Sequence, residues 1–288
     1  GYRLLATSTA ACALHVHGPE LDRVRRVARE HGIALVVGFY EHAGKHTYNS
    51  AIAIEADGTI ASVYRKTHLF GDAEVAAFAP GDQIGPVFTL CDGVRCGMLI
   101  CYDVEFPEAV RSLALAGASL VIVPTANFFP YSFANDPIVR VRAFESHVHV
   151  IYANWSEHTN EDGVHFNGQS VAASPQGEHR LALSPADSGL FHVVLEGVAS
   201  GGAALANHDD DYLRDLRPEL YRTQAAPPHA FVELATYGRL WSCHQLAPFA
   251  DKALRAAGLL GSAGPVDSRP LGSLAALTAL SSDLGDYP

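Results

Sequence analysis

The chain of 288 residues is acidic: 31 Asp and Glu stand against 20 Lys and Arg, which gives a net charge of -11. This charge disfavours contact with a phosphate backbone, and no basic stripe offsets it, so nucleic acid is not expected as a partner. With 48% hydrophobic residues the chain can bury a large core. No apolar run approaches the roughly 18 residues that a membrane span needs, and no membrane partner is expected.

The five cysteines are odd in number and include no CxxC pair, which predicts neither a disulfide framework nor a zinc ribbon. A reducing cytoplasm fits this usage best. No basic region followed by an apolar stretch indicates a secretory signal at the start. The chain opens at Gly1 without an initiator methionine, so we expect a further segment in front of it.

The N-terminal third of the chain predicts one helix and three strands. Charged and apolar residues over 19–31 predict an amphipathic helix, which ends at Gly32, where a left-handed cap is common. The apolar run at 33–40 predicts a buried strand. Residues 49–66 predict two strands joined by an Asp-Gly turn.

Strands and helices alternate through the next hundred residues. Two strands are expected around the Asp92-Gly93 turn, and a helix is expected from Pro107 to Gly117. Further along the chain, one helix is expected at 136–148. Strands are expected at 118–124, 150–154, 170–179 and 189–196. This mixture predicts an α/β sandwich with mixed sheets inside and helices outside.

The composition changes near the C-terminus. Residues 207–222 predict a polar closing segment with a short helix, whereas Ala, Leu, Pro and Ser dominate beyond Thr223. We therefore expect one domain over 1–222 and a C-terminal extension over 223–288, to which the sequence assigns no chemistry.

The strongest motif is GMLICYDVEFPEAV at 97–110. Strand residues stop at Cys101 and a helix begins near Pro107, so the thiol is predicted on a strand-to-helix bend that can expose a nucleophile. Such a bend also offers the backbone N–H of Tyr102 to a developing oxyanion. The plain alternative is a buried structural cysteine.

The segment ICYDVEFPE resembles the nucleophile segment of the nitrilase superfamily, the carbon–nitrogen hydrolases that use a Glu–Lys–Cys triad. Three further segments resemble family blocks in the family's order: VYRKTHLFGDAE at 63–74, VPTANFFP at 123–130 and RAFES at 142–146. The resemblance covers residues 1–222. It implies an α-β-β-α sandwich of mixed sheets that forms four layers on dimerisation, and hence at least a homodimer.

The resemblance implies that Cys101 is the nucleophile and Lys66 the triad lysine, whose ammonium can stabilise the oxyanion. It also implies an additional active-site glutamate at Glu74, although a plain loop carboxylate is an equal alternative. In relatives the general-base glutamate belongs to a Pro-Glu segment shortly before a Gly-Tyr pair. Because this chain begins Gly1-Tyr2, that glutamate is expected upstream, and residues 1–288 alone are expected to show little or no turnover.

Several other residues are candidates for supporting roles. Glu41, at a strand end, is an alternative base. Asp103 is expected to fix the bend rather than to transfer protons. Asn127 and Phe128, with Phe129 beside them, are expected to line an acyl pocket, or else to form a loop that covers the edge of the core.

The sequence predicts no metal or cofactor. The pairs His15/His17 and His147/His149 lack a third ligand at metal spacing. There is no HExxH, P-loop or GxGxxG motif. Glu145, within the RAFES block, is expected to make an internal hydrogen bond rather than to take part in catalysis.

Cys-Tyr-Asp at 101–103, in place of the Cys-Trp-Glu of family nitrilases, favours amides over nitriles. The sequence is similar to the amidase branch, including 5-aminopentanamidase and aliphatic amidases. We expect a cofactor-independent hydrolase that cleaves a small carboxamide to acid and ammonia through a Cys thioester. The alternatives are an N-carbamoyl amidohydrolase or nitrilase of the same fold and, from another class, a non-catalytic dimeric binding module.

Overall fold

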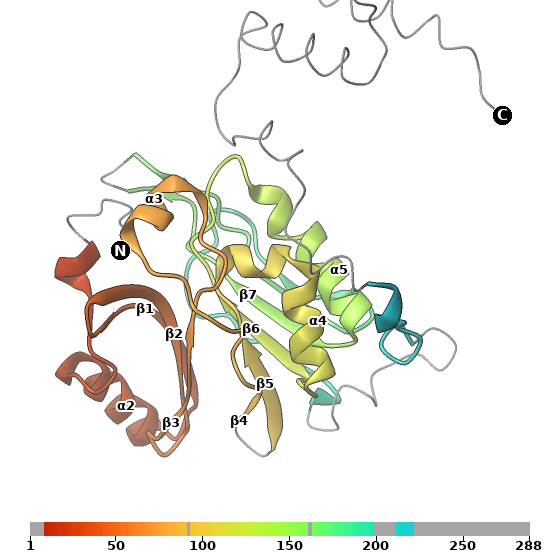
Figure 1. Ribbon diagram of the computed structural model, residues 1–288, viewed down its shortest axis with the longest axis horizontal. Helices are drawn as coiled ribbons and strands as arrows, with labels where there is room; N and C mark the ends of the chain where they lie inside the picture. The colour runs from red at the N-terminus through yellow and green to blue at the C-terminus, as the bar shows by residue number, and fades with distance from the viewer. Residues whose placement is uncertain (1–8, 91–92, 161–162, 199–210, 222–288) are drawn as a thin grey trace, which may run out of the picture. The chain divides into compact units, whose positions relative to one another are not determined.

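The computed structural model describes residues 9–90, 93–160, 163–198 and 211–221 (Figure 1). Across these ranges no helix is both long enough and apolar enough to cross a membrane. The expected C-terminal extension, 223–288, lies outside the described residues, as do residues 207–210 and 222 of the predicted closing segment.

Helix α2 (Pro19–His31) forms one outer layer, as the amphipathic pattern predicts. It begins with proline in its first turn and ends at Gly32, whose φ of 61° is the left-handed conformation that glycine adopts without a steric penalty. Its buried residues Leu21 and Ala28 pack against apolar side chains of the neighbouring sheet. This contact buries the apolar stripe of the helix.

The sheet beneath α2 has three antiparallel strands in the order β1 (Leu35–Ala43), β2 (His46–Ile54) and β3 (Ile60–Arg65). Successive side chains of a strand point to opposite faces. Ile52 and Ile54 of β2 therefore pack under α2, whereas Ala51 and Ala53 join the larger core on the other face. The same alternation determines where the residues at the end of β3 point.

The second sheet has six strands in the order β11-β10-β7-β6-β5-β4. Strands β5, β6 and β7 are parallel, and β4, β10 and β11 add antiparallel edges. The bounds are β4 (Phe88–Leu90), β5 (Val94–Met98), β6 (Leu120–Pro124), β7 (His149–Ala153), β10 (Val171–Ala173) and β11 (His179–Ala182). Such a mixed sheet is what the alternating pattern predicts.

Helices α4 (Pro107–Leu115) and α5 (Pro137–Ser146) link the parallel strands and lie together on the outer side of this sheet (Figure 1). The layers are thus α2, the small sheet, the large sheet and the α4/α5 pair, which confirms the predicted α-β-β-α sandwich. The shorter elements are η1 (Ala10–Cys12), α3 (Gly71–Ala77), η2 (Cys101–Glu105), η3 (Ser132–Ala134), β8 (His158–Thr159), β9 (His165–Phe166) and η6 (Pro218–Leu220).

The strand predicted at 189–196 is wrong: no strand forms there. An alternating pattern shows only that the sequence has the periodicity of a strand. A strand also needs a neighbouring strand with which to pair. This segment is instead anchored by side chains of the large sheet and its edge, because His149 bonds the Glu196 carbonyl at 3.0 Å and the Ser119 hydroxyl donates to the Val198 carbonyl at 2.6 Å. Its apolar side chains Leu190 and Val194 are exposed.

Candidate active site

Cys101 lies at the first residue of the tight turn η2, just after β5 ends. Its φ of 48° lies in the left-handed region, which is uncommon for a residue with a side chain and marks local strain. Cys101 is a free cysteine, and as a residue it is partly buried. The predicted strand-to-helix bend is therefore confirmed in its geometry, since α4 begins at Pro107.

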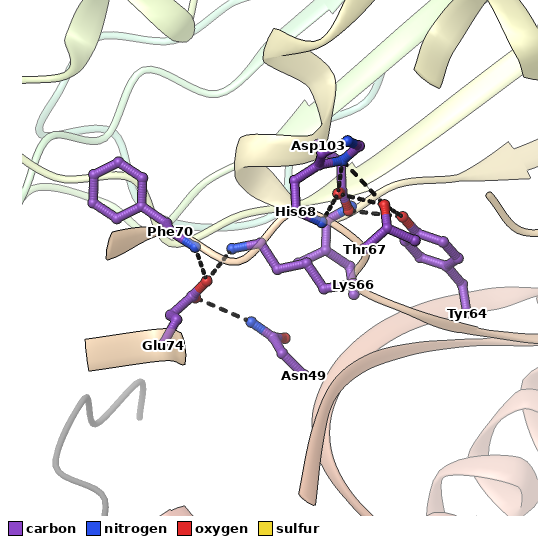
Figure 2. Close-up of polar contacts among 9 residues, drawn as sticks. Asn49, Tyr64, Lys66, Thr67, His68, Phe70, Glu74 and Asp103 are labelled. Carbon is purple, nitrogen blue, oxygen red and sulfur yellow. Dashed lines mark hydrogen bonds and ion pairs between the residues drawn. The ribbon is translucent and has the colours of Figure 1, made fainter. Parts of the chain in front are cut away.

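Asp103 is fully buried and fixes this turn through both of its oxygens (Figure 2). Oδ2 accepts bonds from the Ile100 N–H at 3.0 Å and the Tyr64 hydroxyl at 2.9 Å. Oδ1 accepts bonds from the Thr67 hydroxyl at 3.0 Å and the His68 N–H at 2.9 Å. The carboxylate thus ties the turn that carries Cys101 to the segment that follows β3.

The end of β3 places Lys66 between the two sheets. Tyr64, two residues earlier, belongs to the core between the sheets, and a period of two puts Lys66 on that same face. The Lys66 backbone continues the pairing with β2, because its N–H donates to the Asn49 carbonyl at 2.8 Å. Only 1% of the lysine is exposed, so its side chain is buried rather than solvated.

Glu74, on the short helix α3, is the direct partner of Lys66 (Figure 2). The Lys66 ammonium donates to Glu74 Oε2 at 2.6 Å. The same oxygen accepts the Phe70 N–H at 2.7 Å, and the Asn49 amide donates to Oε1 at 3.3 Å. Glu74 is 1% exposed and accepts hydrogen bonds from three donors, so it is a buried, fully engaged carboxylate rather than a solvated loop residue.

The charges of the thiol and the lysine are coupled. Burial raises the pKa of the Cys101 thiol above its ordinary range, while Lys66 and the Ala126 N–H act in the opposite direction. Burial by itself disfavours the Lys66 ammonium, but the Cys101 and Glu74 charges outweigh it and raise the Lys66 pKa. Lys66 is therefore a fixed cation beside a sulfur that needs one in order to ionise.

One pocket brings most of the predicted site residues together. Its lining combines charged, polar and aromatic side chains: Lys66, Phe70, Glu74, Cys101, Tyr102, Glu105, Ala126, Asn127 and Phe128. Phe70 meets the rings of Tyr102 at 5.1 Å and Phe128 at 5.8 Å edge to face. The oxyanion role of the Tyr102 N–H stays a prediction.

The residues after β6 only partly match their expected role. Asn127 lines the pocket, but its side-chain amide donates to the Tyr131 carbonyl at 2.8 Å and to Asn135 at 2.6 Å. These internal bonds shape the loop. Phe128 contributes its ring to the pocket, whereas Phe129 is 68% exposed and is not part of the lining.

The other candidate carboxylates are engaged elsewhere. Glu41 binds Arg65 through two bonds of 2.9 and 2.6 Å and accepts the Ser50 hydroxyl at 2.7 Å. It lines a second cavity, which does not contain Cys101. Glu145 pairs with Arg142 at 2.8 Å on its own helix, in keeping with an internal role.

Sequence reasoning missed Glu105 and Phe70 as pocket residues. Both carried a positional signal, because Glu105 ends the turn that begins at Cys101 and Phe70 lies four residues after Lys66. Within the described ranges, no group of three His, Cys, Asp or Glu side chains is arranged to hold a metal ion.

Comparison with known proteins extends this picture. A hydrolase from the pqqF 5′ region of Pseudomonas protegens is 41% identical over 77% of this chain and 75% of its own length. An (R)-stereoselective amidase from Pseudomonas sp. is 37% identical over 78% and 79%. Other relatives are a nitrilase from Pyrococcus abyssi and an N-carbamoylputrescine amidase from Solanum tuberosum.

A solved structure shares the fold. It is a variant of the amidase from Nesterenkonia sp. AN1 in which acrylamide has added to the active-site cysteine. It is 36% identical, with a TM-score of 0.62 over 71% of this chain and 74% of that one. Residues 1–193 match the carbon–nitrogen hydrolase family, so the chain is a member of that family, within the nitrilase superfamily.

Proposed function

We propose that this protein is an amidase that hydrolyses a small carboxamide to a carboxylic acid and ammonia through a thioester on Cys101. The observation that carries the proposal is the pocket in which a strained turn presents Cys101 beside the buried Lys66–Glu74 pair. The cysteine adduct described for the Nesterenkonia amidase supports a reactive thiol at the equivalent place.

In this mechanism a general base removes the thiol proton, and the thiolate of Cys101 attacks the amide carbon. Lys66 and the Tyr102 N–H stabilise the resulting oxyanion. The protonated base then gives its proton to the leaving nitrogen, the C–N bond breaks and ammonia departs. Water, activated by the same base, attacks the thioester, which releases the acid and restores the thiol.

We propose that the general base is a glutamate, as the family pattern implies. Glu41, the alternative, is supported less well because Arg65 and Ser50 already occupy its oxygens.

The test of the function is ammonia release from a panel of small amides by the complete protein, with Cys101→Ala as the control. We expect release from the wild type and none above background from the variant. Hydrolysis that survives the substitution would exclude the mechanism, and absence of hydrolysis of every amide would favour the non-catalytic binding module.

The same panel separates the two enzymatic alternatives, to which the relatives named above lend support. Release of carbon dioxide together with ammonia from N-carbamoyl compounds would select a carbamoyl amidohydrolase. Turnover of nitriles but not amides would select a nitrilase. We favour the amide because Tyr102 and Asp103 follow the nucleophile.

We also propose that the protein acts in the cytoplasm and assembles as a homodimer or a larger homo-oligomer. The exposed apolar side chains of Leu190 and Val194 support assembly, since burial of such surface stabilises an interface. Light scattering on the complete protein tests this, and a strictly monomeric mass would contradict it.

A further inference from the structure

Glu105 is a pocket carboxylate to which the mechanism gives no task. It ends the turn that begins at Cys101, and it lines the same pocket. Among the described residues, no side chain or backbone N–H forms a hydrogen bond or ion pair with its carboxylate. A half-buried carboxylate is costly to leave without partners, so this one is open to a partner that the substrate brings.

The cations near Glu105 are already committed to other carboxylates. Lys66 binds Glu74 at 2.6 Å, and Arg142 binds Glu145 at 2.8 Å. Arg142 instead holds the backbone of the turn, donating to the carbonyls of Val104 at 3.1 Å and Glu105 at 2.7 Å. The glutamate is thus held in place by its backbone while its charge is left without a direct counter-ion.

The remaining surroundings of Glu105 favour a cation. Lys66 and Glu74 neutralise each other, so Glu105 gives the pocket a net negative charge even before the thiol ionises. The aromatic residues Phe70, Tyr102 and Phe128 also line the pocket. Aromatic faces attract ammonium groups, and a carboxylate among them repels anionic acyl groups.

The position of Glu105 limits where that cation lies on the substrate. Glu105 is four residues from Cys101 on one short turn, and its negative charge acts on the thiol. Glu105 lines the same pocket as Cys101 and Lys66. Burial raises the pKa of Glu105, and the positive charges of Lys66 and Arg142 oppose that rise. A group bound there is separated by only a few bonds from the carbonyl that Cys101 attacks.

We propose that Glu105 binds an ammonium group on the acyl side of the substrate, so that the preferred substrates are carboxamides with an amino group close to the carbonyl. This inference rests on the proposed amidase function. It makes Glu105 a specificity residue, because the bond to ammonium selects among amides and leaves the chemistry at Cys101 unchanged.

The first test compares two amides of equal shape, β-alaninamide and butanamide, by kcat/KM in the complete protein. The wild type should prefer β-alaninamide, and Glu105→Gln should lower that preference by about tenfold or more, as expected when a partly buried charge pair loses one partner. Glu108→Gln is the matched control, because Glu108 is exposed on the next helix. An unchanged preference in Glu105→Gln would overturn the inference.

The second test reads the charge of the pocket without any hydrolysis. Cys101 is modified with a cationic reagent, 2-aminoethyl methanethiosulfonate, and with an anionic one, 2-sulfonatoethyl methanethiosulfonate, and the peptide carrying Cys101 is followed by mass spectrometry. The ratio of the cationic to the anionic rate should fall several-fold in Glu105→Gln and stay constant in Glu108→Gln.

The two tests separate the inference from the function on which it rests. If neither amide is hydrolysed but the modification ratio falls in Glu105→Gln, the amidase function fails while the cation preference of Glu105 holds. If both amides are hydrolysed and Glu105→Gln slows them equally with an unchanged modification ratio, the function holds and the inference is wrong.

Discussion

Two neighbouring cations, Arg65 and Lys66, each bind a buried glutamate, yet they belong to different parts of the molecule. Arg65 points to the α2 side of its sheet, where it forms a bidentate pair with Glu41 and remains 41% exposed. Lys66 points between the sheets, where both it and Glu74 are 1% exposed. Strand alternation alone separates the two pairs.

The difference shows that residue type does not decide the role of an ion pair. Among the described residues that line the cavity beside Arg65 and Glu41, none carries a thiol or a hydroxyl other than the Tyr64 phenol. The Lys66–Glu74 pair shares its pocket with Cys101. The first pair is therefore expected to contribute to stability and the second to catalysis.

The largest expected effect is that of Lys66→Met. Removing the cation beside the developing oxyanion should lower kcat/KM by about 10²- to 10³-fold. Because Lys66 also lowers the thiol pKa, alkylation of Cys101 by iodoacetamide should require higher pH in the variant. Arg65→Met, the matched control, should change kcat/KM by less than about twofold.

A folding defect is distinguished from a catalytic one by Lys66→Met/Glu74→Gln. This double variant removes both charges of the Lys66–Glu74 pair, so neither is left without its partner, and its thermal unfolding should lie closer to the wild type than that of Lys66→Met. Its kcat/KM should stay low. Recovery of activity in the double variant would contradict the role of Lys66.

The next effect is that of Glu74→Gln. Loss of this partner should displace the ammonium and lower its pKa, because Glu74 raises the pKa of Lys66. Since misplacement of a catalytic group costs up to about 10²-fold, kcat should fall within that range. Steady-state kinetics check this, and a kcat equal to that of Glu41→Gln would show that the two pairs are equivalent.

Asp103→Asn should act through the turn rather than through the chemistry. In the wild type both carboxylate oxygens accept hydrogen bonds from N–H and O–H groups. Whichever way the new amide is turned, its NH2 group therefore faces other donors. We expect a loss of about 1 to 3 kcal/mol in the free energy of unfolding. Urea unfolding measures it, and an unchanged midpoint would show that the network does not hold the turn.

The smallest effect on rate is expected for Glu41→Gln, which should instead change the pH dependence of stability. Arg65 and Ser50 outweigh burial and lower the Glu41 pKa below its ordinary 4.5. A lowered folded-state pKa stabilises the protein above the unfolded-state pKa, and this contribution is lost as the pH falls through the folded-state value. The difference in Tm between wild type and variant should therefore be largest above pH 4.5 and shrink on acidification.

Local sequence patterns predicted those elements whose conformation is determined by residues close to them in the sequence. The turn at Cys101 follows from strand residues that stop where Pro107 allows a helix to begin, and α2 follows from its apolar stripe and Gly32. The resemblance to family blocks supplied Lys66 and Glu74, which no spacing rule identifies.

The remaining features depend on contacts between distant segments. The strand at 189–196 failed because pairing needs a neighbour that periodicity does not reveal. The sequence predicted Asn127 as a pocket residue. Its hydrogen bonds to Tyr131 and Asn135 depend on the folded conformation of the loop, which the sequence pattern does not show. Glu105 was overlooked because its proposed role depends on Lys66 and Arg142 being paired with other carboxylates, which the sequence does not show.

The most direct test of the central claim is to quench the complete protein with acid during turnover of butanamide and to determine the mass of the peptide that carries Cys101. The account predicts a butanoyl group on that peptide, removable by neutral hydroxylamine as a thioester is, and no such group in Cys101→Ala. An acyl group on another residue, or hydrolysis at an undiminished rate in Cys101→Ala, would contradict it.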